Sequence, residues 1–363
     1  MYLKCRDWLT TVCGLSLSDK PGRFGVEVET ETREASDYPR GFLSTVPPAQ
    51  PGGHHSWETP MKSWAAINDG SLRNFGVEFV LKGPQTIAEV KESLKEFKKH
   101  LGDVEFIEGS QSTSVHVHIN ILDMSMTELV SFVMLYSYFE NLLVEFSGDM
   151  RRSNLFALPL RVCDSSLSQF LRGVVAFDYG NPQHFPRDET AWKYSALNFC
   201  PIWKHGSVEI RTMRGTTDTE EILKWVSILN KLVDFALGKT PDSVIQLIRR
   251  NRVDMVQLVF QEFASLLETP DIREMLSRNL IFPVMIHNTI KDWSSFEDKI
   301  KAIYSKEVKK VQGKTPERPW ANTAFEFLPA YLSVKTGFPG DEIPDEWYNL
   351  LRQEIVAYSG ESF

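Results

Sequence analysis

Apolar and polar residues alternate along several short segments, and this two-residue period predicts strands with one buried face. Five segments show it: 24–32 (FGVEVETET), 76–81 (GVEFVL), 114–120 (SVHVHIN), 194–200 (YSALNFC) and 207–214 (SVEIRTMR). Because a turn at 204–206 separates the last two segments, we expect them to form a hairpin.

Longer segments repeat their apolar residues at the helical period of 3.6. Residues 86–101 form one of them, and residues 128–146 are apolar almost all round, which predicts a helix buried against the sheet. Residues 217–237 begin with capping residues and acids and stop before Gly238, which predicts a helix. From residue 240 onward, several segments also repeat their apolar residues at helical spacing. This pattern predicts an α+β fold: an antiparallel or mixed sheet packed by helices, with an additional helical C-terminal part.

Two regions lack either period and are expected to be irregular. Residues 33–62 contain five prolines and three glycines, which suit a long loop that closes over a neighbouring site. His54 and His55 belong to this loop. The middle of the chain, around 178–189 (DYGNPQHFPRDE), is polar and irregular as well.

Composition narrows the class of protein. The 363 residues carry a net charge of -8, which argues against binding to a nucleic-acid backbone as the main function. The longest uncharged apolar stretch, 129–139, is shorter than a membrane span, and the N-terminus lacks the apolar core of a signal peptide. The cysteines show no disulfide or zinc spacing, so we expect a cytoplasmic protein; they are Cys5, Cys13, Cys163 and Cys200.

Three of the predicted strands carry polar residues two positions apart, with valine or isoleucine between them. The pairs are Glu27 and Glu29, His116 and His118, and Glu209 and Arg211. Residues two apart project from the same face of a strand, so each strand has one apolar and one polar face. If the polar faces share a surface, these acids and Glu78 repel one another unless they are protonated or bridged by cations.

The kinds of side chain indicate which ligands such a site accepts. Carboxylate oxygens with an imidazole suit Mg²⁺ or Mn²⁺ better than zinc. Arg211 is not a metal ligand, but its guanidinium suits a phosphate held between it and the metal. Each pair alone also fits a solvated sheet face, so the combination carries the prediction.

Five motifs follow one another along the chain: FGVEVE, INDGSLRNFGVEFVL, SVHVHIN, KYSALN and SVEIRTMRGT. Their order resembles the pattern of the amidoligase family, whose fold is that of glutamine synthetase and glutamate–cysteine ligase. The resemblance spans about residues 22–237, and Arg214 is an extra arginine relative to the pattern. The matching residues are Glu27, Glu29, Trp64, Asp69, Gly70, Ser71, Glu78, His116, His118, Tyr194, Asn198, Glu209, Arg211 and Gly215.

The resemblance implies a ligase that uses ATP and Mg²⁺ or Mn²⁺ to join a carboxylate to an amine through an acyl phosphate. The implied metal ligands, of which only one histidine need bind, are Glu27, Glu29, Glu78, His116, His118 and Glu209. The implied catalytic residues are Arg211, Glu209 and Glu29. The implied nucleotide contacts are Arg211, Arg214, Asp69 and Ser71. The implied contacts to the acyl substrate are Lys193, Tyr194 and Asn198.

The resemblance also divides the chain into an N-terminal arm (1–21), an amidoligase-like catalytic domain (22–238) and a helical C-terminal part (239–363). The expected partners are small-molecule or peptide carboxylates and amines, with no membrane. Two other functions remain open: a metal-dependent hydrolase or phosphotransferase using the same residues, and a non-catalytic binding or assembly protein. A phage origin, the identity of the substrates and the oligomeric state also stay open.

Overall fold

The computed structural model describes residues 3–11, 17, 22–39, 56–57, 59–148, 151, 154, 157–160, 163–178 and 194–311. Within them, one sheet has the strand order β2-β3-β4-β1-β5-β7-β6, and every neighbouring pair is antiparallel. The strands are β1 (Phe24–Thr32), β2 (Ser56–Trp57), β3 (Trp64–Ile67), β4 (Phe75–Leu81), β5 (Ser114–Asn120), β6 (Leu197–Asn198) and β7 (Ser207–Arg214). The α+β class is confirmed, and of the two kinds of sheet predicted, antiparallel or mixed, the structure has the antiparallel one.

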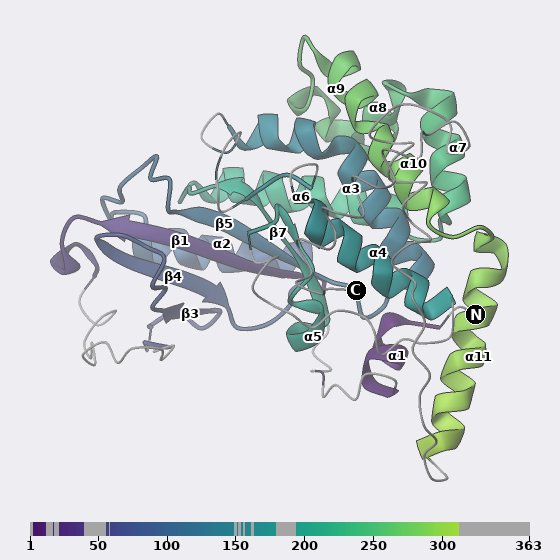
Figure 1. Ribbon diagram of the computed structural model, residues 1–363. Helices are drawn as coiled ribbons and strands as arrows, with labels where there is room; N and C mark the ends of the chain where they lie inside the picture. The colour runs from purple at the N-terminus through teal and green to yellow at the C-terminus, as the bar shows by residue number, and fades with distance from the viewer. Residues whose placement is uncertain are drawn as a thin grey trace, which may run out of the picture.

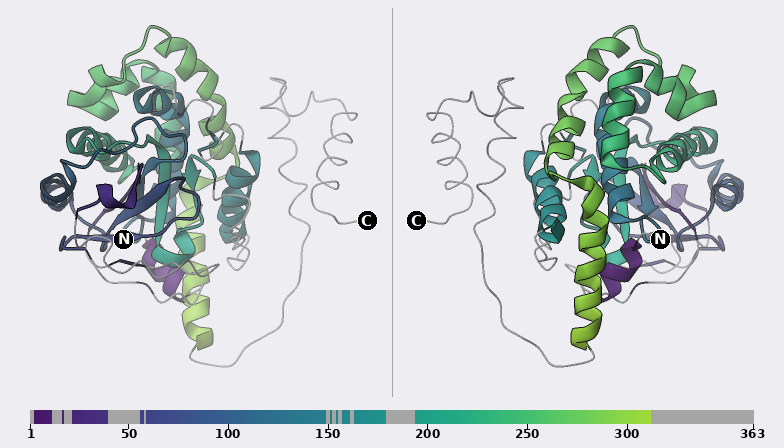
Figure 2. Two further views of the ribbon diagram at one scale, coloured as in Figure 1. Left: turned by 90° about the vertical axis from the view of Figure 1, so that its left-hand side faces the viewer. Right: turned by 90° about the vertical axis from the view of Figure 1, so that its right-hand side faces the viewer.

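Helices cover one face of the sheet and extend beyond one end of it (Figure 1). Those within the first 240 residues are α1 (Cys5–Thr11), η1 (Ala35–Asp37), α2 (Ile87–Leu101), α3 (Met126–Ser147), α4 (Asp164–Asp178), α5 (Ile202–His205) and α6 (Thr219–Ala236). Those that follow are α7 (Pro241–Asn251), α8 (Asp254–Phe260), η4 (Gln261–Leu266), α9 (Ile272–Asn279), α10 (Ile281–Asn288) and α11 (Trp293–Val311). Helices α7, α9 and α10 contact α3, and α11 runs past α1, as Figure 2 shows from two sides.

The valines and isoleucines of the central strands lie on the face that the helices cover. Val26, Val28, Val115, Val117 and Ile210 are fully buried. Helices α2 and α6 pack on each other behind the sheet in Figure 1, and α3 contacts β7. The two-residue period therefore predicted the orientation of these strands, and the other face carries the polar side chains.

Local capping explains where the main helices begin. Thr86 caps α2, Ser125 caps α3 and Asp218 caps α6, each by accepting a hydrogen bond from a backbone amide of the first turn. The predicted helices at 86–101 and 217–237 are confirmed to within two residues, and α3 begins two residues before the predicted 128–146. Gly238 (φ +70°) ends the helical region after α6, and Thr240 caps α7.

The prediction of a wholly irregular loop at 33–62 was wrong in part. The loop at 33–62 contains η1 and the edge strand β2, and β3 follows it directly; residues 40–55, including His54 and His55, lie outside the described part. Helix α4 ends at Asp178, where the polar stretch 178–189 begins, and the rest of that stretch lies outside the described residues. The hairpin is confirmed, but β6 is only two residues long and the short helix α5 occupies the connection.

Helix α3 is the centre of the core. By length and composition it could span a membrane, but 83% of its apolar window is buried inside the protein. One cluster of buried apolar side chains extends from Trp8 of α1 through α3 to Phe296 of α11. The described helices beyond residue 239 therefore share a core with the sheet.

Candidate functional site

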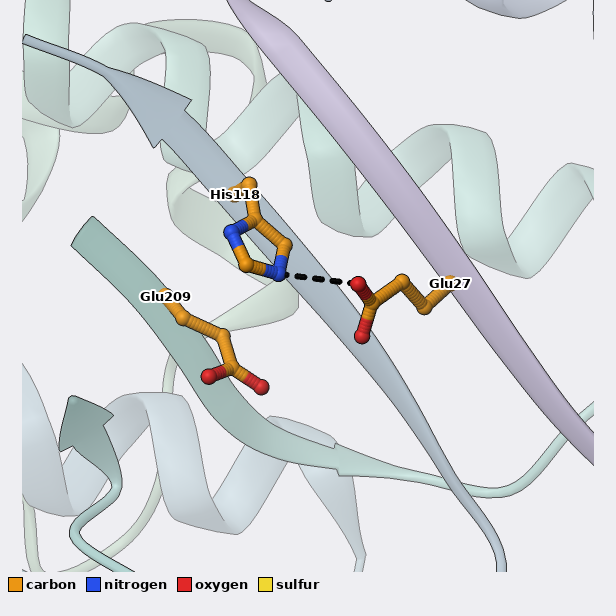
Figure 3. A group of neighbouring side chains, drawn as sticks. All are labelled: Glu27, His118 and Glu209. Carbon is orange, nitrogen blue, oxygen red and sulfur yellow. Dashed lines mark ion pairs between the residues drawn. The ribbon is translucent and has the colours of Figure 1, made fainter. Parts of the chain in front are cut away.

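The register of the sheet brings the predicted polar pairs together on one face. Glu29 lies opposite Glu78, Glu27 opposite His116, and His118 opposite Glu209. Residues directly opposite each other on neighbouring strands share a face and lie within side-chain contact. Figure 3 shows three of them, Glu27, His118 and Glu209, pointing toward one another from β1, β5 and β7. The convergence predicted from the sequence is confirmed. We call Glu27, Glu29, Glu78, His116, His118 and Glu209 the carboxylate–histidine cluster.

Glu27 is the centre of this cluster because its carboxylate lies between the two imidazoles. Its Oε1 is 3.0 Å from Nε2 of His118, and its Oε2 is 3.2 Å from Nδ1 of His116. Nδ1 of His116 is also 3.3 Å from Oε1 of Glu209. Three strands thus contribute groups to one small volume.

Two sets of side chains in this cluster have ligand atoms close enough to share a cation. In each set these atoms lie within 4.8 Å of one another. One set is Glu27, His118 and Glu209, and the other is Glu27, Glu78 and His116. Both histidines therefore occupy positions suited to a ligand, and Glu27 belongs to both sets.

The cluster is largely shielded from water, which makes its charge costly. The exposed fractions are 2% for His116, 4% for Glu29 and Glu209, and 8% for Glu78. Burial, together with the negative charge of Glu27, raises the pKa of Glu78 to about 10, so this side chain binds a proton when no cation is present. Carboxylates crowded in this way favour a bound divalent cation, which takes the place of the proton.

The histidines partly balance the acids. Burial opposes the charged form of Glu27, but His118 and His116 outweigh it and hold the pKa of Glu27 well below its usual value. Burial also disfavours the charged form of His118, but the carboxylate of Glu27 raises the pKa of His118 to about 9. At neutral pH these two groups form an ion pair.

Arg211 and Asn198 hold the carboxylate of Glu209 from two sides. Nη1 of Arg211 donates to Oε1 at 2.5 Å, and Nδ2 of Asn198 donates to Oε2 at 2.7 Å. Burial raises the pKa of Glu209, but Arg211 and the two histidines lower it by a larger amount. The pKa of Glu209 therefore lies below its usual value. Asn198, predicted to contact the acyl substrate, therefore belongs to the cluster's own hydrogen-bond network.

Ser114 is a member of this network that the sequence did not single out. Its hydroxyl donates to Oε2 of Glu29 at 2.5 Å and lies 2.6 Å from Nε2 of His116. Ser114 precedes His116 by two residues, so the same period that relates the two histidines points to it. It links Glu29 to the rest of the cluster.

Glu31 continues the row of acids on β1 but has a different role. Its carboxylate accepts bonds from the Arg73 amide (2.7 Å), Asn74 (3.3 Å), Ser110 (3.0 Å) and Ser112 (2.6 Å). With these donors it is satisfied without a cation. It joins β1 to the β3–β4 turn and to the loop before β5.

The remaining predicted residues lie in other settings. Asp69 and Ser71 form a hydrogen-bonded turn between β3 and β4, with 2.8 Å from the Ser71 amide to Oδ1 of Asp69. Tyr194 is 41% exposed. Arg214 forms an ion pair with Glu221 at the start of α6 and donates to the Ser147 carbonyl, so these contacts direct it toward the helices. Lys193 lies outside the described residues.

His205 stands at the edge of the cluster and was not predicted. Its ring meets that of His118 edge to face, with 6.2 Å between the ring centroids. Burial and the nearby His118 lower the pKa of His205, which favours its neutral form. No sequence pattern pointed to His205, because it lies in α5, where a turn was expected.

Gly215, a residue of the family pattern, has a steric reason to be glycine. A Cβ atom at this position would lie 2.1 Å from Oγ1 and 2.9 Å from the backbone carbon of Thr113. We expect Gly215→Ala to lower the free energy of unfolding by about 1–3 kcal/mol, measured by urea denaturation. Gly70→Ala is the control, since nothing lies within 4 Å of its Cβ position; equal stability of the two variants would contradict this close approach.

Taken together, the cluster and Arg211 can hold divalent cations beside a guanidinium, an arrangement suited to chemistry on phosphate groups. Comparison of the chain with protein-family models and with curated proteins found no match. The resemblance to the amidoligase family therefore stays a prediction.

Proposed function

We propose that this protein is an ATP-dependent carboxylate–amine ligase that forms an amide bond through an acyl phosphate. The observation that carries the proposal is the meeting of Glu27, Glu78, His116 and Glu209 with Arg211 on one buried sheet face. Three acids, an imidazole and a guanidinium rarely share a buried volume without ligands that balance their charges. A nucleoside triphosphate with divalent cations supplies both signs of charge.

The side chains of the cluster fit Mg²⁺ or Mn²⁺. They offer carboxylate oxygens with one imidazole in each three-residue set, which hard divalent cations accept. The raised pKa of Glu78 supports this fit, because that carboxyl group is held neutral only while no cation is present. When bound, these cations would neutralise negative charge on the phosphates.

The other side chains have roles that follow from their contacts. Arg211, anchored by Glu209, can donate to oxygens of the transferred phosphoryl group, and Asn198 keeps Glu209 in place. In the proposed reaction a substrate carboxylate oxygen attacks the γ-phosphorus and ADP leaves. The amine nitrogen then attacks the acyl carbon, gives up a proton and displaces phosphate, so the products are an amide, ADP and phosphate.

The glutamine synthetase-like topology is part of this proposal. An antiparallel sheet with helices on one face and charged residues on the other is compatible with it. The order of the five motifs supports the same assignment. The acid and the amine remain to be identified.

The test is release of ADP and phosphate by the purified protein with panels of carboxylic acids, amines and peptides. We expect turnover only when both an acid and an amine are present, with the amide detected by mass spectrometry. Glu209→Gln is expected to lower the rate at least about 100-fold, because it weakens the anchor of Arg211 and a cation ligand. Turnover with water alone would instead indicate the hydrolase, and no turnover with any panel would favour the binding protein.

A further inference from the structure

One buried arginine, Arg151, belongs to none of the five sequence motifs. Arg151 lies between α3 and α4 with 2% of its surface exposed. A guanidinium is costly to remove from water, so its donors need acceptors. Two of them reach the backbone of β7: Nε donates to the Thr212 carbonyl at 3.0 Å, and Nη2 donates to the Arg211 carbonyl.

These carbonyl groups lie where β7 departs from regular strand geometry. Arg211 and Thr212 together oppose the single residue His116 of β5, which makes a bulge in β7. On the other side of β7, strand β6 pairs with Glu209 and Ile210, and the Arg211 amide still donates to the Ala196 carbonyl at 2.9 Å. A bulge disrupts the regular hydrogen bonds between strands, so buried carbonyl groups there need other donors. Arg151 supplies a donor to each of these two carbonyl groups.

Two neighbouring side chains at the bulge point to opposite faces of the sheet. Arg211 projects to the polar face, where it bonds to Glu209 at 2.5 Å. Thr212 projects to the helices, where its hydroxyl lies 2.9 Å from the Tyr136 hydroxyl of α3. By holding the backbone at the bulge, Arg151 thus supports the segment from which the guanidinium of Arg211 reaches the cluster.

We propose that Arg151 is a positioning residue that fixes the bulge in β7 and thereby aims Arg211 at the phosphoryl groups of a bound nucleotide. This inference rests on the proposed function, since it needs a nucleotide for Arg211 to contact. Arg151 acts through the backbone of Arg211 and makes no contact with the nucleotide itself. Its planar fork matters more than its charge, because one fork donates to two successive carbonyls.

The experiment measures Mg²⁺-dependent binding of a non-hydrolysable ATP analogue by calorimetry to the parent, Arg151→Met, Arg211→Met and the double variant. Each single substitution is expected to weaken binding about 10- to 100-fold, the range for hydrogen bonds to charged groups. If Arg151 acts only through Arg211, the double variant binds no more weakly than Arg211→Met. Additive losses would show a separate contact with the nucleotide and overturn the inference.

Arg151→Lys separates geometry from charge and serves in the same cycle if Arg151→Met does not fold. Lysine keeps the positive charge but lacks the planar fork, so we expect a loss of at least about tenfold. Binding equal to that of the parent would overturn the inference.

The variant Asn279→Leu tests whether a general loss of stability alone weakens binding of the analogue. Asn279 is also buried and donates to a backbone carbonyl, that of Tyr138, but it lies in α9. This variant is expected to unfold at a lower temperature while binding the analogue like the parent. If the parent itself binds no analogue, the proposed function fails and this inference with it; if the parent and Arg151→Met bind equally, the inference alone fails.

Discussion

Replacing Glu27 with glutamine is expected to abolish tight Mn²⁺ binding, with a loss of affinity of at least about 100-fold. Removing residues that only support metal ligands costs about 10- to 100-fold, and Glu27 is itself shared by both possible cation sets. One of its oxygens faces His118 and the other faces His116, so a single substitution removes a ligand from each set. Free Mn²⁺ can be followed by its electron paramagnetic resonance signal during a titration.

Glu297→Gln is the matched control for this titration. Glu297 is also a buried glutamate, but it lies in α11 and bonds to Thr127 at the start of α3. It is expected to change stability without changing Mn²⁺ affinity. If Glu27→Gln bound Mn²⁺ as the parent does, the cluster would not be the metal site.

The second large effect concerns Glu78 in protein freed of metal by a chelator. The folded protein holds a proton on Glu78 up to about pH 10, whereas the unfolded chain releases it near pH 4.5, so stability falls as pH rises between these values. His118 acts in the same direction: its contribution is complete below about pH 6.5 and is lost as pH rises through about 9. Each group contributes a slope of at most about 1.4 kcal/mol per pH unit.

Glu78→Gln is therefore expected to be more stable than the parent at pH 8 by about 1–3 kcal/mol when metal is absent. Its stability is also expected to depend less steeply on pH, because only the contribution of His118 remains between pH 6.5 and 9. Saturating Mg²⁺ is expected to reverse the order, since the parent alone keeps both cation sets intact. Denaturant unfolding at several pH values measures these differences. If the variant were less stable than the parent in chelator at pH 8, burial and the nearby carboxylates would not be destabilising the charged form of Glu78.

The sequence predicted the centre of the site because strand periodicity carries over directly into three dimensions. Glu27, His116 and Glu209 each follow the two-residue rule, and antiparallel pairing of β1, β5 and β7 places them on one face. The same rule explains why the valines between them are buried. Glu78, in the predicted strand at 76–81, was expected on the same surface, and the register places it opposite Glu29.

The supporting groups were harder to predict because their roles depend on backbone far away in sequence. Arg151 matters through carbonyl groups of β7, and no spacing rule relates residues 151 and 212. Glu31 shares the period of Glu27 and Glu29, yet donors from two loops satisfy it fully. Arg214 was expected to contact the nucleotide, but its ion pair with Glu221 directs it toward α6. Periodicity predicts the face of the sheet on which a side chain lies, whereas the groups that contact it depend on the tertiary structure.

A crystal structure with Mn²⁺ and a non-hydrolysable ATP analogue would show whether the carboxylate–histidine cluster and Arg211 bind a metal–nucleotide complex, because anomalous scattering locates Mn²⁺ independently of any assumption about the site. We expect anomalous peaks within about 2.3 Å of carboxylate oxygens of Glu27, with the analogue's γ-phosphate within hydrogen-bond distance of Arg211. Peaks located elsewhere, or an analogue bound away from the polar face of the sheet, would contradict this expectation.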